Sequence, residues 1–170
     1  LATLVDDPEV DGLLALMLLH HARRRSRTRP DGGIVPLAEQ DRSQWDTELI
    51  AEGLALVQAA LAQDRLGEYQ AQAAIAALHA DAPCFEDTDW IQILEWYDEL
   101  LRFADTPIIR LNRAVALGEA DGPPAGLAAL ADIDENIPRR DAVAAHLHER
   151  NGDLELAARL YASAAHNAPN

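Results

Sequence analysis

Apolar residues recur along this chain at the spacing of α-helices, and the pattern is clearest near the C-terminal end. Ala157, Tyr161 and Ala164 stand at i, i+4 and i+7, with Gly152 before them as a turn and Pro169 after them as a stop. Small residues at the alanine positions allow antiparallel helices to cross closely, and the tyrosine is expected to fill the groove between them. The segment therefore predicts the second helix of a tetratricopeptide (TPR) repeat, which needs packed neighbours to bury its face.

The same periodicity predicts about eight helices separated by turns rich in Gly, Pro and Asp. They are expected at about residues 8–22, 41–63 (starting near Asp41 or Ser43), 67–80, 88–103, 107–120, 125–134, 139–151 and 153–166. Setting Gly122 against Gly152 gives an offset a little below the TPR period of about 34 residues. The predicted fold is all-α: a right-handed, TPR-like solenoid of antiparallel helical hairpins. We expect one domain over residues 1–170, with an N-terminal helical pair at 1–66 and TPR-like hairpins at 67–170.

Several local signals refine this prediction. Gly53 in the middle of a helix costs ~1 kcal/mol relative to Ala, so we expect a neighbouring helix to approach closely there. Asp7-Pro8 and Thr106-Pro107 predict capped helix starts, and Thr88 is expected to cap the helix at 88–103. Two apolar stripes on that helix place it at the centre of the core.

Composition and charge narrow the classes of function. Aromatic residues make up only 5% of the 170 residues, which favours closely packed helices over sheets. The net charge is −15, and all 14 basic residues are arginine. Such a surface repels phosphate, which argues against nucleic-acid binding by this chain and favours a basic protein partner.

The cellular setting follows from the cysteine count and from hydropathy. One cysteine, Cys84, excludes an internal disulfide framework and fits a reducing compartment. No apolar run approaches the ~20 residues that span a bilayer. We therefore expect a cytoplasmic protein without membrane contact, and the start at Leu1 without Met suggests a fragment of something longer.

Candidate catalytic residues do not combine into a site. His146 and His148 lie two residues apart and point away from each other on a helix, so they cannot chelate one metal ion. His20 and His21 are adjacent, and one is expected in the core and the other at its edge. Cys84 has neither a Cys-x-x-Cys partner nor a sequence-adjacent base. The sequence thus predicts no enzyme, no metal site and no cofactor.

Arginines gather after the first predicted helix, at positions 23, 24, 25, 27 and 29. One interpretation is that these cations complement the C-terminal end of the helix and remain solvated. The other is a binding site for an anion or for a partner's carboxylate, because arginine pairs carboxylates in a bidentate way. Under the second interpretation Arg23 and Arg27 are the specific contacts.

Two further sets of polar residues are candidates for binding. The segment Gln40-Asp41-Arg42-Ser43-Gln44-Trp45-Asp46 is either a capping network, with Asp41 as the cap and Trp45 as an anchor, or a partner contact. Its candidate contact residues are Gln40, Asp41, Arg42 and Trp45. Gln72, Asn112 and Arg113 stand among apolar residues, where they either satisfy buried turns or line a groove.

Taken together, these segments resemble a known family. The residues that carry the resemblance are Glu9-Val10, Leu13 to His20, Ala22-Arg23, Gln40 to Asp46, Leu49 to Gly53, Tyr69 to Ala77, Thr88-Asp89-Trp90, Tyr97-Asp98, Leu111 to Ala116 and Asp121-Gly122-Pro123. They are similar to the C-terminal extension of a group of bacterial extracytoplasmic-function (ECF) sigma factors. Members look like a promoter-binding core, regions two and four, followed by a TPR-like domain, and neither core region is present here.

The resemblance implies that the parent protein initiates transcription with RNA polymerase and that this part modulates it. We therefore expect a non-enzymatic regulatory and protein-interaction domain. Its partners would be the sigma core regions of the same polypeptide, RNA polymerase, or both. The alternative is a sensory domain whose concave groove binds a small ligand or peptide, with Gln72, Asn112 and Arg113 pointing inward.

Overall fold

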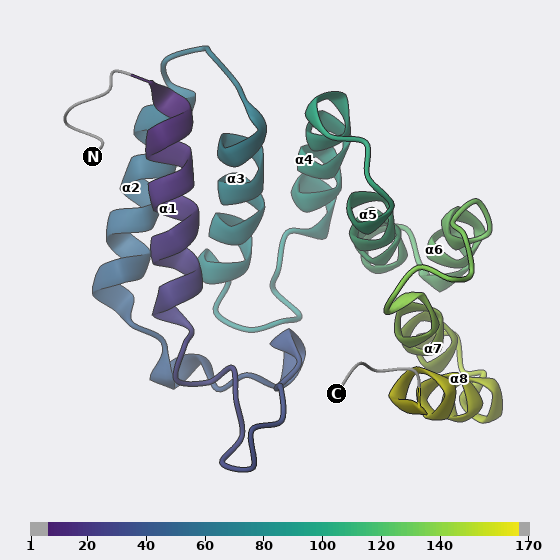
Figure 1. Ribbon diagram of the computed structural model, residues 1–170. Helices are drawn as coiled ribbons and strands as arrows, with labels where there is room; N and C mark the ends of the chain where they lie inside the picture. The colour runs from purple at the N-terminus through teal and green to yellow at the C-terminus, as the bar shows by residue number, and fades with distance from the viewer. Residues whose placement is uncertain (1–6, 167–170) are drawn as a thin grey trace. The chain divides into compact units, whose positions relative to one another are not determined.

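The computed structural model describes residues 7–166, which form eight α-helices and two short 3-10 helices (Figure 1). The helices are α1 (Pro8–Ala22), η1 (Leu37–Glu39), η2 (Arg42–Gln44), α2 (Thr47–Leu61), α3 (Glu68–Asp81), α4 (Trp90–Phe103), α5 (Pro107–Ala120), α6 (Pro123–Leu130), α7 (Arg140–Arg150) and α8 (Leu154–His166). Within the described residues there is no β-strand, only an isolated bridge between Thr28 and Ile34. The predicted all-α class is confirmed.

The chain divides into two compact units, Leu1–Trp96 and Tyr97–Asn170. The boundary falls inside α4. Helix α3 packs on both α1 and α2, so the first unit extends beyond the predicted division at residues 66 and 67. In the second unit consecutive helices pack in pairs, α5 with α6, α6 with α7 and α7 with α8.

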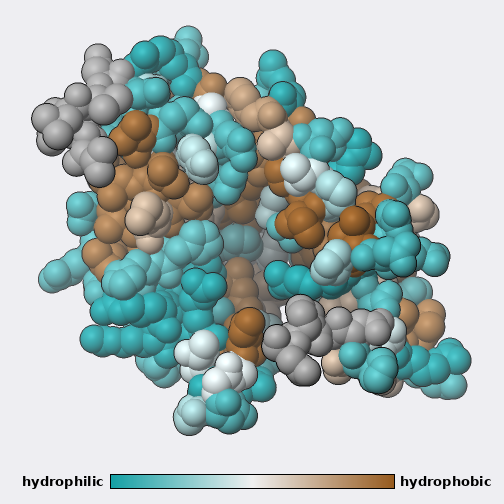
Figure 2. Space-filling model, in the orientation of Figure 1, coloured by the Kyte–Doolittle hydropathy of each residue, from teal (hydrophilic) through white to brown (hydrophobic). Residues whose placement is uncertain are grey.

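Helices α1, α2 and α3 lie side by side and enclose the core of the first unit (Figure 1). Its buried residues are mostly small: Ala15, Leu19, Val57, Ala73, Ala74 and Ala77. Because these side chains are small, the helix backbones can approach closely, and van der Waals contacts between the helices form without large core residues. The outer side of α1 stays apolar, with Leu13 37% and Met17 61% exposed, and Figure 2 shows hydrophobic surface over α1 and α2.

Glycines mark the two closest approaches in this unit. A Cβ placed on Gly53 would lie 2.8 Å from Leu19 Cγ of α1, which confirms the close approach predicted there. A Cβ placed on Gly12 would lie 2.8 Å from the backbone nitrogen of Gln70 in α3. Helix α1 therefore touches α2 and α3 at positions where only glycine fits.

The Glu9 carboxylate of α1 lies at the N-terminal end of α3. It accepts hydrogen bonds of 2.9 Å from the backbone N–H groups of Tyr69 and Gln70, and one of 3.2 Å from the Gln70 side-chain amide. A side chain on Gly67 would overlap Glu9. Because the first N–H groups of a helix lack partners inside the helix and form its positive end, the carboxylate satisfies two of them and complements the helix dipole.

The core of the second unit lies between α5, α6 and α7. It consists of Leu111, Ala114, Leu130, Ile133, Ala144 and Leu147. Helices α5 and α6 cross at two glycines, since a Cβ on Gly126 would lie 2.9 Å from Gly118 Cα and 2.7 Å from the Ala114 carbonyl oxygen. The buried Glu119 carboxylate joins α5 to α7 through His146 and Arg150, each at 2.8 Å.

Several helix starts agree with the sequence and others differ. Asp7 caps α1 through the Glu9 N–H at 3.0 Å, and Thr106 caps α5 through the Ile109 N–H at 3.3 Å, as predicted. Helix α2 starts at Thr47 with Asp46 as its cap, not near Asp41 or Ser43. The earlier start was wrong because residues 42–44 form a separate 3-10 turn held by Asp41.

The expected role of Thr88 as a cap is also wrong. Thr88 is buried and its hydroxyl points back to the Cys84 carbonyl oxygen, while Asp89 accepts the 2.9 Å bond from the Gln92 N–H. Helix α6 runs over Pro123–Leu130 instead of 125–134, because proline is well suited to the first turn.

Two packing predictions are wrong because side chains expected in the interior are exposed. Helix α4 buries Ile93 and Leu100 but exposes Ile91 and Phe103, so it is not the centre of the core. Ala157 is buried as expected, whereas Tyr161 is 40% exposed and its hydroxyl donates to Glu149 at 2.9 Å instead of filling a groove. Pro169, the predicted stop, lies outside the described residues.

We expect Gly12→Ala to destabilise the protein by about 1–3 kcal/mol, because the added methyl group would clash with the backbone of α3. At an exposed helical position the same change would stabilise by up to ~1 kcal/mol, so the sign is diagnostic. Urea unfolding followed by circular dichroism measures it. Ala55→Gly, at an exposed position of α2, is the control for helix propensity alone; an increase in stability for Gly12→Ala would contradict the close approach.

Candidate functional site

The connection between α1 and α2 places Arg42 at the C-terminal end of α3. Asp41 holds η2 in shape by accepting bonds from the Ser43 backbone N–H (3.0 Å), the Ser43 hydroxyl (2.6 Å) and the Gln44 side chain (2.9 Å). Arg42 Nη1 then donates to the carbonyl oxygens of His79 at 2.6 Å and Ala82 at 2.7 Å. A cation thus meets the last carbonyls of α3, which form the negative end of the helix.

Trp45 anchors this connection to the end of α1. Its side chain is 6% exposed, and its indole N–H donates to the Ser26 hydroxyl at 2.8 Å. The Ser26 hydroxyl in turn donates to the Arg23 carbonyl at 3.1 Å. The guanidinium carbons of Arg42 and Arg23 lie 4.5 and 5.8 Å from the centre of the indole ring. One buried aromatic ring therefore positions two arginines by cation–π contact.

Two histidines complete what we call the Arg–His cluster: His20, Arg23, Arg27, Arg42 and His79. His20 Nδ1 lies 2.9 Å from Arg23 Nη2, and the His79 ring packs edge-on against Trp90 with centroids 5.2 Å apart. Burial, and after it the charges of Arg23, Arg42 and His20, together lower the pKa of His79 to about 4. The pKa of His20 is also lowered, first by burial and then by Arg23 and Arg27.

Several polar atoms of this region have no hydrogen-bond partner although they are buried. They are Nη2 of Arg42, Nδ1 of His79 and Oε1 of Gln40. Gln40 makes one bond, from its side-chain amide to the Val35 carbonyl at 3.0 Å. Buried polar groups are usually paired, so this concentration of unpaired atoms is a feature that calls for a physical explanation.

The structure brings Arg23, Arg42 and Trp45 together, with Arg27 close enough to act on the pKa values of His20 and Arg23; their role as contacts to a partner stays a prediction. Gln40 and Asp41 flank them, each in local hydrogen bonds. Sequence reasoning missed His79, because its approach to Arg42 spans 37 positions and no local pattern signals it. The expectation that His20 or His21 enters the core is wrong, since both keep solvent exposure and the burial that lowers the pKa of His20 is only partial.

The three residues predicted to line a groove belong to different units and are described separately. In the first unit, the Gln72 side chain donates to Glu68 of the same helix at 3.0 Å. In the second unit, Arg113 donates to Asp98 at 2.6 Å, and Asn112 is exposed. Arg113 and Asp98 line a pocket of about 350 Å³ with Arg110. The inward orientation of these residues in one groove stays a prediction.

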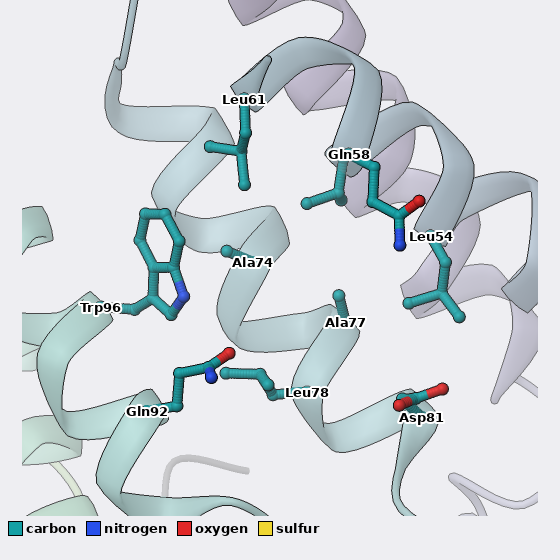
Figure 3. A pocket seen from close by; sticks show the side chains of 10 residues that line it. Leu54, Gln58, Leu61, Ala74, Ala77, Leu78, Asp81, Gln92 and Trp96 are labelled. Atoms are coloured by element: carbon teal, nitrogen blue, oxygen red, sulfur yellow. The ribbon is translucent and has the colours of Figure 1, made fainter. Parts of the chain in front are cut away.

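A second pocket lies in the first unit between α2, α3 and the start of α4 (Figure 3). Its volume is about 220 Å³, and Leu54, Leu61, Leu78 and Trp96 give it apolar walls. Polar side chains of Gln58, Asp81 and Gln92 stand at its edges. The volume is below the ~300 Å³ at which pockets for drug-sized ligands begin.

Two observations bear on metal binding and on the reactivity of Cys84. Within 7–166, no group of three His, Cys, Asp or Glu side chains is placed to hold a metal ion. The Cys84 thiol donates to Asp87 at 3.1 Å, and this bond is the main reason that its pKa is raised, which disfavours the nucleophilic thiolate. No described helix is long and apolar enough to cross a membrane.

Comparison with known proteins gives similarity without an assigned activity. The model of a family of unknown function, DUF6596, matches residues 1–61, which include Arg23, Arg42 and Trp45. An uncharacterized protein of Rhizobium meliloti (strain 1021) is 45% identical over 131 residues, covering 77% of this chain and 31% of that protein. The chain thus spans less than a third of the length of this relative. No solved structure matches.

We expect the His79 ring to titrate at about pH 4, below the ordinary value of 6.5. Between about pH 4 and 6.5 the His79 ring is therefore protonated in the unfolded chain but neutral in the folded protein. The contribution of the buried neutral ring to the free energy of unfolding is complete above pH 6.5. It is lost progressively as the pH falls from about 6.5 to 4. An NMR titration of the assigned ring carbon measures the midpoint. A midpoint near 6.5 would contradict the burial of this ring beside two arginines.

Proposed function

We propose that this chain is a regulatory and protein-interaction domain of a longer protein similar to ECF sigma factors. It modulates transcription initiation by contacting sigma core regions two and four of the same polypeptide, RNA polymerase, or both. In this proposal the helices continue as a right-handed, TPR-like solenoid of antiparallel hairpins. The domain works in the cytoplasm, without enzyme activity, cofactor or metal, and contacts neither nucleic acid nor membrane itself.

The observation that carries the proposal is the distribution of charge. The chain has 29 acidic residues against 14 arginines. Arginines 29, 102, 110, 113 and 150 are paired with carboxylates of the chain itself, and Arg42 and Arg140 bind backbone carbonyls. Because these arginines are already bound within the chain, most of the 29 acidic side chains have no arginine left to neutralise them. The acidic excess attracts a basic protein surface and repels phosphate backbones.

Two further observations agree with a domain that binds other protein parts. Consecutive helices pack in pairs in the second unit, an arrangement compatible with hairpin repeats. The similar Rhizobium protein is more than three times as long as the stretch it shares with this chain. Sequence of this kind therefore occurs as one part of a larger polypeptide.

Among the predicted contact residues, the structure favours different roles. Asp41, Arg42 and Trp45 make the internal bonds described above, which supports their role in holding the connection in place. Arg27 is exposed. We therefore assign Arg27, with the free edge of Arg23, to the partner contact within this set.

The proposal predicts saturable binding when the chain is titrated with a sigma core fragment containing regions two and four from a protein of this kind. Binding should weaken steadily as the salt concentration rises from 50 to 500 mM, because surface charges are screened within about 10 Å at 0.1 M salt. Fluorescence anisotropy of the labelled core measures it. Absence of binding at the lowest salt would contradict an acidic docking domain.

Arginine variants separate a specific contact from general attraction. Removing any arginine makes the chain more acidic, so general attraction to a basic partner should increase slightly. We expect Arg27→Ala nevertheless to weaken binding, since it removes a donor to a partner carboxylate. Arg102→Ala, at an exposed position of α4 paired only with Glu99, is the matched control and should not weaken it. Equal behaviour of the two variants would exclude Arg27 from the interface.

A further inference from the structure

Among the described residues, the three arginines of the Arg–His cluster form no ion pair with a carboxylate, unlike five other arginines of the chain. Arg29, Arg102, Arg110, Arg113 and Arg150 each lie within 3.2 Å of an Asp or Glu oxygen. Arg23 instead contacts the imidazole of His20, and Arg42 contacts two backbone carbonyls. Glu86 acts on Arg42 through its charge without forming an ion pair. Arg23, Arg27 and Arg42 thus concentrate positive charge in one small region.

Capping of α3 accounts for only one of the two terminal nitrogens of the Arg42 guanidinium. Its Nη1 donates to both carbonyls, whereas the buried Nη2 has no hydrogen-bond partner. Nδ1 of His79, on the same helix end, is also buried and unpaired. An unpaired buried polar atom costs about 1–3 kcal/mol, so two such atoms at one helix end are a candidate site for a ligand that can pair with them.

We propose that Arg23, Arg42 and His79 form a binding site for an oxyanion, a carboxylate or a phosphate group, at the C-terminal end of α3. Trp45 fixes the two guanidinium groups, Arg42 Nη2 and Arg23 supply charge-assisted hydrogen bonds, and Arg27 adds to the positive field. His79 donates from Nδ1 in the tautomer or charge state that an adjacent anion favours.

The oxyanion can come from two sources with the same chemistry. One is an Asp or Glu side chain of a protein partner, in which case the site belongs to the interface proposed above. The other is a free small anion such as phosphate. The site itself does not depend on the sigma-factor proposal, because it can be tested with inorganic phosphate alone.

The first experiment measures thermal stability with sodium phosphate replacing sodium chloride at constant ionic strength. We expect phosphate to raise the midpoint of unfolding, because a ligand that binds the folded state stabilises it. Arg23→Gln should reduce the apparent affinity at least about tenfold, the effect of losing one charged donor. Arg25→Gln removes the same charge from the same exposed segment but does not act on the pKa values of the cluster, and it should behave as the original protein.

The second readout needs no variant and therefore remains valid if Arg23→Gln fails to fold. A bound anion next to His79 should raise the pKa of the ring, so the NMR titration midpoint should move up in phosphate relative to chloride. The other titratable and charged groups that act on the ring, His20, Arg23 and Arg42, are the same in the two buffers. Equal phosphate effects in all three proteins, or a His79 midpoint that does not move, would overturn the site.

The source is then identified with the sigma core. If Arg23→Gln weakens both the phosphate effect and binding of the core, and phosphate competes with the core, the site receives a partner carboxylate. If core binding is unaffected while the phosphate effect is lost, the site receives a free anion. Absence of core binding together with a normal phosphate effect would contradict the proposed function and retain the site.

Discussion

Helix α3 is fixed at both ends by charged side chains from other parts of the chain, and the first unit depends on this arrangement. The Glu9 carboxylate accepts from N–H groups at its start, including that of Gln70. The Arg42 guanidinium donates to the carbonyls of His79 and Ala82 at its end. A negative group at the positive end and a positive group at the negative end each stabilise the helix dipole. The two contacts also fix where α1 and the α1–α2 connection lie against α3.

The second unit satisfies exposed helix ends in a similar way. Arg140, at the start of α7, donates to the carbonyl oxygens of Leu130 and Ile133 at the end of α6. The buried carboxylate of Glu119 lies between His146 and Arg150. Among the described arginine–carboxylate pairs, Glu119 is a buried acid, whereas the acids paired with Arg29, Arg102, Arg110 and Arg113 are partly exposed. With 29 acidic residues against 14 arginines, an excess of acids remains after these pairings.

The elements that could be predicted from sequence are those set by neighbouring residues. The caps at Asp7 and Thr106 follow from a polar side chain directly before proline. The close contact at Gly53 follows from glycine in the middle of a helix, where its low helix propensity indicates that a larger side chain would not fit. The start of α2 could not be predicted, because Asp41 and Asp46 are equally good caps; in the structure Asp41 caps the separate turn η2 and Asp46 caps α2, with Trp45 buried between them.

The candidate site was predictable in part for the same reason. Arg42 and Trp45 lie in one short segment that is rich in polar residues, and Arg23 lies in the run of arginines after the first helix. Both signals are local and can be found in the sequence. Glu9 reaches the start of α3 from 60 positions away, and Arg42 reaches its end from 37 positions away, with no periodic signal of their own. Tertiary packing alone decides that they meet α3, so the contacts that define the site appear only in the folded chain.

The claim that α3 is held from outside is tested most directly by native-state hydrogen exchange of the Tyr69 and Gln70 amides. First-turn amides of an uncapped helix have no acceptor inside the helix and exchange rapidly. Because both donate to Glu9, the account predicts protection comparable to that of amides in the middle of α3, such as Ala74. Rapid exchange at Tyr69 and Gln70 while the middle of α3 remains protected would contradict it.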